Sequence, residues 1–268
     1  MPPRLTSFLN VQKTQKLRSP TAAAAAELDF WQFLERPCAV FSKHTMSRFS
    51  GTKVIAVAKN YAAHRAEMRA LESAAGVSPA AAPERPFFFI KPRSSVLNPG
   101  GSIVRPSRCA DLHHEVELGV VIKRACTRSR ADDWRSYVSG YVLALDMTAR
   151  DLQAEAKRAG HPWTLGKCWD TFTPMSAVVS ADAVPDPHAL ELWLKVDGVE
   201  KQRGSTGDML ARVPRLIEEI SAVMTLEEGD VILTGTPQGV GPVLPGQVIT
   251  GGITGMPAFD VSFPVVQG

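Results

Sequence analysis

Two glutamates at the front of an apolar run are the residues of this sequence best suited to chemistry. In "DLHHEVELGVVI" (111–122), a strand would place His113, Glu115 and Glu117 on one side, because successive side chains of a strand alternate. Residues two apart on a strand are about 6.8 Å apart, so both glutamates can reach one ion. Two carboxylates on one side repel each other unless a cation, a proton or water compensates. The pattern favours a divalent metal site over the alternative, a solvated edge strand, because "LGVVI" continues as a buried element.

A third acid follows a different apolar run. Asp146 ends "YVLALD" directly before a predicted helix, and we expect Thr148 to cap that helix, which leaves Asp146 available for another task. Two glutamates and one aspartate make an all-oxygen ligand set. Such a set suits Mg²⁺, or Mn²⁺, and leaves coordination positions for water and substrate, whereas zinc more usually recruits His or Cys.

A base and several cations stand in other motifs. In "NYAAHRAEM", His64 and Glu67 are three residues apart, so on a helix the carboxylate can orient the imidazole; a surface contact is the alternative. Lys167 lies among apolar residues, where it either faces an anionic substrate or extends to solvent. Arg150 and Gln153 share a helix face just after the third acid, facing either a substrate carboxylate or solvent.

Composition excludes several classes of protein. No apolar run is long enough to cross a bilayer, and the four cysteines show no CxxC pairing, which argues against a disulfide framework or a thiolate zinc site. The net charge of +3 comes from the first 50 residues, and the rest of the chain is nearly neutral, which argues against nucleic-acid binding.

The N-terminal residues have a different composition from the rest of the chain. The first 26 residues contain no acid and several Ser and Thr, which is typical of an organellar transit segment; a disordered or wrongly assigned leader is the alternative. We therefore expect an extension over 1–47, a single catalytic domain over 48–268 and a mitochondrial location, or a cytoplasmic one if the extension is not a transit segment.

The remaining pattern predicts an α+β protein with more strands than helices. The alternation of strands and helices is too irregular for a barrel or a doubly wound sheet, so we expect a mixed, mainly β domain with a few flanking helices. Expected strands include 53–61, 86–92 and 137–146, expected helices 62–76, 148–160 and 209–224, and an Asp-Gly turn predicts a hairpin over 190–204. "GTPQGVG" lacks the ending of a phosphate loop and predicts a tight turn approaching a ligand or another chain segment.

Seven motifs in order resemble the fumarylacetoacetate hydrolase superfamily, over about residues 53–253. They are "KNYAAHRAEM", "FFFIKP", "LHHEVELGVVI", "LALDMTARDLQ", "PWTLGKCWDTFTP", "DPHALELWLKVDG" and "LEEGDVILTGTPQGVGP". The residues "HHEVELGVVI" and "LALDMTARD" are particularly similar to those of the mitochondrial acylpyruvate hydrolases that also decarboxylate oxaloacetate. The chain departs from the family's usual Gly-Arg at Ala58 and Lys59, and its Ala/Pro loop over 74–84 is longer.

The resemblance implies roles for the candidate residues. Glu115, Glu117 and Asp146 would be the Mg²⁺ ligands, His64 with Glu67 a water-activating dyad on a lid, and Lys167 a cation beside the reacting group. The substrate would be held by Arg150, Gln153 and Thr236, with Lys91 nearby. The implied fold is a mixed β-sandwich roll, usually a homodimer.

The implied activity is Mg²⁺-dependent hydrolysis of the carbon–carbon bond of acylpyruvates such as acetylpyruvate and fumarylpyruvate, with decarboxylation of oxaloacetate at the same site. A small 2-oxo acid is thus the expected partner. Alternatives within the superfamily are a fumarylpyruvate-specific hydrolase, a dienoate isomerase and a 4-oxalocrotonate decarboxylase. The alternative from another class is a non-catalytic metal-binding scaffold.

Overall fold

The computed structural model describes residues 49–74 and 85–268. All of them fall in one compact unit, Met46–Gly268. The predicted leader over 1–47 lies outside the described residues, as does most of the Ala/Pro loop, so the predicted domain division stays a prediction. Within the described ranges, every helix is too short or too polar to cross a bilayer.

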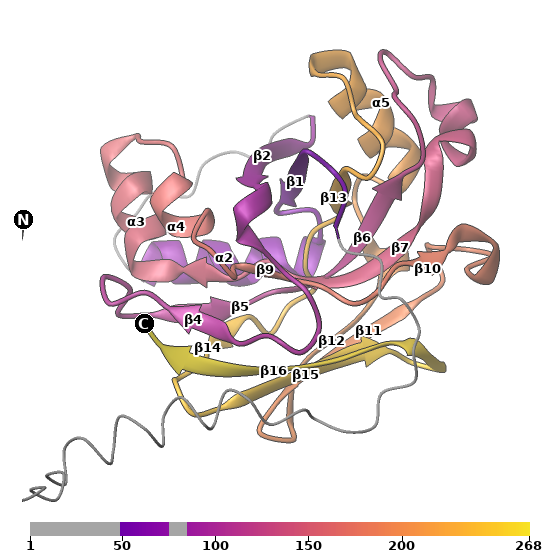
Figure 1. Cartoon of the computed structure of the whole chain (residues 1–268). Helices are drawn as coiled ribbons and strands as arrows, with labels where there is room; N and C mark the ends of the chain where they lie inside the picture. The colour runs from indigo at the N-terminus through magenta and orange to yellow at the C-terminus, as the bar shows by residue number, and fades with distance from the viewer. Residues whose placement is uncertain (1–48, 75–84) are drawn as a thin grey trace, which may run out of the picture. The chain divides into compact units, whose positions relative to one another are not determined.

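Two large β-sheets form the domain (Figure 1). The six-stranded sheet has the order β10 (Val179–Ser180), β7 (Val138–Leu145), β6 (Val116–Ile122), β13 (Val231–Leu233), β1 (Lys53–Ala58), β2 (Phe87–Pro92). The five-stranded sheet has the order β12 (Val199–Ser205), β11 (Glu191–Val196), β15 (Val248–Ile253), β16 (Met256–Gln267), β4 (Ile103–Arg105). Smaller sheets join β14 (Gly241–Pro242), β5 (Leu112–His114) and β8 (Thr148–Ala149), and β3 (Val96–Leu97) with β9 (Thr173–Pro174).

Few helices accompany the sheets. Among the described residues, the α-helices are α2 (Ala62–Ala74), α3 (Arg150–Ala159), α4 (Thr164–Lys167) and α5 (Val213–Val223), and the 3₁₀ turns are η1 (Arg93–Ser95), η2 (Ala131–Tyr137), η3 (Ala181–Ala183) and η4 (Thr206–Asp208). Helices α3 and α4 lie together at one end of the domain, and α5 lies at the other (Figure 1). The predicted mixed, mainly β fold with a few helices is confirmed.

Alternation along the strands divides the core between the two faces of the six-stranded sheet. Leu118 and Val120 of β6 belong to the main apolar cluster, together with side chains of the five-stranded sheet such as Leu194 and Phe263. Val121 points to the opposite face and belongs to a smaller cluster. Strand β6 is buried at every residue because apolar side chains cover both faces, which explains why its sequence is apolar except at Glu117.

The strand predicted across 111–122 is two strands. β5 pairs with β14 and β8, whereas β6 pairs with β7 and β13, and Glu115 lies at the break between them. At this break the Glu115 carbonyl accepts the Asp146 N–H at 2.8 Å, and the Val116 N–H donates to the Gln202 side chain at 3.0 Å. A change of sheet has no signature in hydrophobic periodicity, and it brings the acid after β7 beside the acid before β6.

Of two local predictions, the hairpin turn is confirmed and the helix cap is wrong. The hairpin between β11 and β12 turns at Asp197 and Gly198, both with positive φ (49° and 79°), as the Asp-Gly signal predicts. The predicted Thr148 cap of α3 is wrong, because the residue before the helix is Ala149 and no side chain caps it. The Thr148 hydroxyl instead donates to Glu115 Oε1 at 3.1 Å.

Asp230 directly precedes β13, and its side chain binds the start of β1. We expect Asp230→Asn to lower the free energy of unfolding by about 2–3 kcal/mol. Its fully buried carboxylate accepts the backbone N–H groups of Thr52, Lys53 and Glu227 at 2.9–3.1 Å and forms an ion pair with the Lys53 ammonium at 2.5 Å. Burial raises the pKa of Asp230, but Lys53 and the backbone donors outweigh burial and lower it.

Because folding lowers this pKa, the stabilisation from Asp230 is fully present above its unfolded-state pKa. It is lost as the pH falls through its folded-state pKa. The difference in unfolding free energy between wild type and Asp230→Asn should therefore shrink in acid, as urea denaturation at several pH values will show. Glu227→Gln is the control, because the Glu227 carboxylate is half exposed and pairs with Lys53 only at 3.4 Å. A loss as large in this control as in Asp230→Asn would contradict the prediction.

Candidate active site

Three buried carboxylates converge where the two halves of the predicted strand meet. Glu115, Glu117 and Asp146 each offer one oxygen, and these oxygens lie within 4.8 Å of one another. The register explains the meeting, since Val116 pairs with Leu145 in the β6–β7 ladder and so brings the residues on either side together. The three acids are only 6%, 2% and 2% exposed. Their convergence is the arrangement that the sequence predicted.

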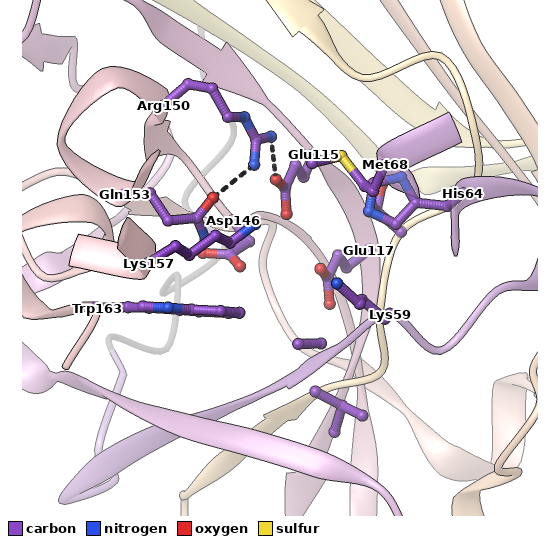
Figure 2. Close-up of a pocket in the computed structure, with 13 residues that line it drawn as sticks. Lys59, His64, Met68, Glu115, Glu117, Asp146, Arg150, Gln153, Lys157 and Trp163 are labelled. Atoms are coloured by element: carbon purple, nitrogen blue, oxygen red, sulfur yellow. Dashed lines mark hydrogen bonds and ion pairs between the residues drawn. The ribbon is translucent and has the colours of Figure 1, made fainter. Parts of the chain in front are cut away.

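Cationic side chains contact two of these acids. Lys167 of α4 donates to Glu115 Oε2 at 3.0 Å and to Asp146 Oδ2 at 2.6 Å. Arg150 of α3 donates to Glu115 Oε1 at 2.5 Å (Figure 2), and Lys91 of β2 to Asp146 Oδ1 at 2.5 Å. Although burial raises the pKa of Glu115, Lys167 and Arg150 lower it well below its usual range.

Glu117 has a different environment from the other two acids. Its Oε2 accepts the Gly235 N–H at 2.6 Å. Burial, followed by the charges of Asp146 and Glu115, raises the pKa of Glu117 well above its ordinary value. A buried, repelled carboxylate with hard oxygen neighbours is what a divalent cation would stabilise. The three residues therefore fit the predicted metal.

The predicted dyad is present on α2. His64 Nδ1 and Glu67 Oε2 are 3.2 Å apart, and the Glu67 carboxylate also accepts the Gly239 N–H at 3.1 Å. Burial raises the pKa of Glu67, but the hydrogen bonds to His64 and Gly239 outweigh it and lower the pKa. With Nδ1 engaged, His64 offers Nε2 to the cavity, whose wall it forms.

A cavity opens over the acids and is lined from several elements. Figure 2 shows Arg150, Gln153, Lys157 and Trp163 opposite His64, Met68 and Lys59, with the three acids between them. Arg150 donates to Gln153 Oε1 at 2.8 Å, so these two predicted substrate-binding residues are held together at the rim. The lining is Val57, Ala58, Lys59, His64, Met68, Glu115, Glu117, Asp146, Arg150, Gln153, Lys157, Trp163 and Thr236.

Two predicted cations lie behind this lining. Lys91 is fully buried, and besides Asp146 it donates to the Phe172 carbonyl at 2.8 Å. Burial lowers the pKa of Lys91, although Asp146 opposes this. Burial also acts to lower the pKa of Lys167, but Asp146 and Glu115 outweigh it and raise that pKa. In this structure both side chains hold the carboxylates, while their predicted roles toward substrate stay predictions.

The glycine-rich turn after β13 closes the site. Gly235 and Gly239 have positive φ (97° and 93°), and their N–H groups bind Glu117 and Glu67 respectively. A Cβ at Gly239 would lie 2.2 Å from the Lys201 carbonyl oxygen, so only glycine fits there. Thr236 lies between them and lines the cavity. The turn approaches both the site and a neighbouring chain segment.

Sequence reasoning missed three residues that build the site. Trp163 forms an apolar wall and packs edge-on against Phe87 and Phe89. Thr148 supports Glu115, and Gln202 of β12 bonds to the turn after β13. Trp163 could have been chosen from the sequence, because it stands in the "PWTLGKCW" motif beside Lys167. Thr148 and Gln202 could not, because their roles depend on contacts between segments that are distant in the sequence.

Comparisons with known proteins agree with this architecture. Residues 53–262 match the family model described as "Fumarylacetoacetate (FAA) hydrolase C-terminal". An oxaloacetate tautomerase, mitochondrial, of Arabidopsis thaliana is 52% identical over 215 residues, covering 80% of this chain and 91% of the relative. An oxaloacetate decarboxylase, mitochondrial, of Dictyostelium discoideum is 48% identical over 227 residues, covering 82% and 98%. A solved fumarylpyruvate hydrolase from Pseudomonas aeruginosa, in complex with Mn²⁺ and pyruvate, is 33% identical with a TM-score of 0.75, covering 88% and 99%.

Proposed function

The chain belongs to the fumarylacetoacetate hydrolase family, and from this premise we propose that it is a divalent-metal-dependent enzyme acting on oxaloacetate. The proposed reactions are interconversion of the keto and enol forms and decarboxylation to pyruvate. The predicted superfamily and the mitochondrial location are confirmed, since the two relatives named above are mitochondrial proteins. Tautomerisation was not among the activities predicted from the sequence; the Arabidopsis relative suggests it.

The convergence of the three acids carries the proposal. Glu115, Glu117 and Asp146 would hold Mg²⁺ or Mn²⁺, and the ion would act as a Lewis acid and template for a 2-oxo acid. The three carboxylates are matched by three cationic side chains, Lys91, Lys167 and Arg150. A divalent ion would thus add positive charge to a site whose carboxylates are already matched by cations, which suits a dianion such as oxaloacetate.

The surrounding residues are placed to bind the substrate and move its protons. Arg150 and Gln153, joined at the rim, would bind a carboxylate of the substrate. His64 Nε2 would take a proton from carbon 3, and protonation of the resulting enolate oxygen would give the enol; in the reverse direction His64 would return the proton to carbon 3, with Glu67 fixing the ring. Loss of the carbon 4 carboxylate as CO₂ yields the enolate of pyruvate without any water. Trp163 and Met68 exclude water from part of the cavity wall.

Hydrolysis of acylpyruvates is a second candidate, favoured by the dyad. Tied to Glu67, His64 can deprotonate a water that attacks the distal carbonyl, after which the carbon–carbon bond breaks and the pyruvate part leaves as an enolate. The solved fumarylpyruvate hydrolase supports this alternative. We also propose a homodimer, as the resemblance implies, to be tested by sedimentation.

A substrate panel tests the function. Oxaloacetate, acetylpyruvate and fumarylpyruvate would be supplied with Mg²⁺, with Mn²⁺ and with EDTA, and enol absorbance and pyruvate release would be followed. We expect the conversion of oxaloacetate to be accelerated by metal and abolished by EDTA. Metal binding without turnover of any substrate would favour the scaffold alternative, and turnover unchanged by EDTA would contradict the metal site.

A further inference from the structure

Gln202 makes four hydrogen bonds beneath the cavity although it does not line it. The residue belongs to β12 and is 1% exposed. Its Oε1 lies 3.0 Å from the Val116 backbone nitrogen and 3.0 Å from His114 Nδ1. Its Nε2 lies 2.8 Å from Thr236 Oγ1 and 3.0 Å from the Pro237 carbonyl oxygen. One amide therefore links the segment of the metal ligands to the turn after β13.

The backbone partners fix which way this amide faces. The Val116 N–H can only donate, so the atom beside it must be the amide oxygen, and the Pro237 carbonyl can only accept, so the atom beside it must be the nitrogen. His114 must accordingly carry its hydrogen on Nδ1. Both ends of the amide are thus fully hydrogen-bonded. If the amide were flipped, its NH₂ group would face the Val116 N–H and its oxygen would face the Pro237 carbonyl, so both hydrogen bonds would be lost.

The fixed amide also determines what the Thr236 hydroxyl can do. Because Gln202 Nε2 donates to Thr236 Oγ1, the hydroxyl hydrogen of Thr236 points to another acceptor. Thr236 lines the cavity beside Glu117, so that hydrogen is available to an anion there. A Cβ added at Gly204, two residues after Gln202, would lie 2.4 Å from Pro237 Cβ, so β12 and the turn pack too closely for Thr236 to move away.

We propose that Gln202 is a positioning residue, which acts through Thr236 by making its hydroxyl a dedicated hydrogen-bond donor to the carboxylate of the bound substrate. The inference rests on the proposed function, because it assigns the acceptor to an anionic 2-oxo acid. Gln202 itself does not touch the substrate. The structure assigns it a selective role, since a hydroxyl constrained to donate favours a carboxylate over a neutral ligand.

A double-mutant cycle between Gln202 and Thr236 tests the proposal. Gln202→Met, Thr236→Val and the double variant would be compared by the KM and kcat for oxaloacetate and by calorimetric titration of the Mg²⁺-loaded protein with oxalate. We expect each single change to weaken oxalate binding and raise KM by about ten- to a hundredfold, the range of a hydrogen bond to a charged group, with a smaller change in kcat. The double variant should be no worse than Thr236→Val alone. Additive losses, or a Gln202→Met protein that binds oxalate like wild type, would overturn the proposal.

A second variant keeps the shape of the side chain. In Gln202→Glu, one carboxyl oxygen still accepts the Val116 N–H. The other oxygen carries at most one hydrogen, and the Pro237 carbonyl needs that hydrogen, so none is left to donate to Thr236. The Thr236 hydroxyl should then donate to the new carboxyl group, so oxalate binding should weaken as in Thr236→Val. Oxalate affinity equal to that of wild type in this variant would also overturn the proposal.

Thr234→Val is the matched control for loss of a buried hydroxyl in the same turn. Thr234 Oγ1 donates to the Leu118 carbonyl at 2.9 Å and does not line the cavity. This change should lower the melting temperature and leave oxalate affinity within about twofold of wild type. A large loss of affinity here would show that any disturbance of the turn suffices, against a specific role of Gln202. If wild type bound no oxalate with Mg²⁺ present, the proposed function would fail instead.

Discussion

Glu117→Gln should strongly weaken metal binding and at the same time make the metal-free protein more stable, by about 1–2 kcal/mol at neutral pH. The raised pKa of Glu117 means that folding places an ionisable carboxyl group where its charge is unfavourable. Above the unfolded-state pKa this costs stability, and a neutral amide removes the cost. Urea denaturation in EDTA measures the gain.

Glu115→Gln is the matched variant and should give the opposite sign. It leaves Lys167 and Arg150 without one of their partners in a buried site, so the metal-free protein should lose about 2–4 kcal/mol. Both variants should lose the stabilisation that Mg²⁺ gives to wild type, because each lacks one charged ligand oxygen. Calorimetric titration should show metal affinity reduced about a hundredfold or more.

The pair of variants separates two explanations of the acidic cluster. If the three acids only form a buried ion network with their cations, both substitutions should destabilise, and Mg²⁺ should have no effect on wild type. If they form a metal site, Glu117, whose pKa is raised by burial and by the charges of Asp146 and Glu115, is the carboxylate that destabilises the metal-free protein. Equal destabilisation by both variants would contradict the metal site.

The sequence predicted the members of the site better than the path of the chain through it. Glu115, Glu117 and Asp146 could be chosen because charged residues inside apolar runs are conspicuous. Their meeting, however, depends on the break between β5 and β6 and on the β6–β7 register, which involve two sheets at once. Hydrophobic periodicity reports which face of a strand is buried and carries no information about a change of partner.

The supporting residues were hidden for a related reason. Thr148 stands where a helix cap is expected, yet its hydroxyl donates to Glu115, because tertiary contacts outweigh a local preference. Gln202 stands in an edge strand, at a position where a polar side chain is expected to face solvent. Its burial follows from the turn after β13 packing against β12 through Gly204 and Gly239. Those glycines were visible in the sequence, but not the segments that they bring together.

His64→Ala should separate the two proposed chemistries by a large factor. Hydrolysis of an acylpyruvate requires a base that deprotonates water, so its kcat should fall by about 10²–10⁴. Decarboxylation of oxaloacetate needs no water, since breaking the bond to CO₂ leaves the electron pair on the pyruvate enolate, and only the final protonation of carbon needs an acid. We expect that rate to fall by no more than about tenfold, measured as pyruvate release on the same protein preparation.

Glu67→Gln refines this prediction, because Glu67 acts through His64 and never reaches the cavity. The amide retains a partner for His64 Nδ1 but removes the negative charge that stabilises the imidazolium formed when water is deprotonated. Hydrolysis should therefore fall less than in His64→Ala, by about tenfold to a hundredfold, because the remaining base is weaker. Tautomerisation should follow hydrolysis, since proton abstraction from carbon 3 also needs the base. Equal loss of hydrolysis, tautomerisation and decarboxylation in both variants would instead assign α2 a purely structural role, in closing the cavity.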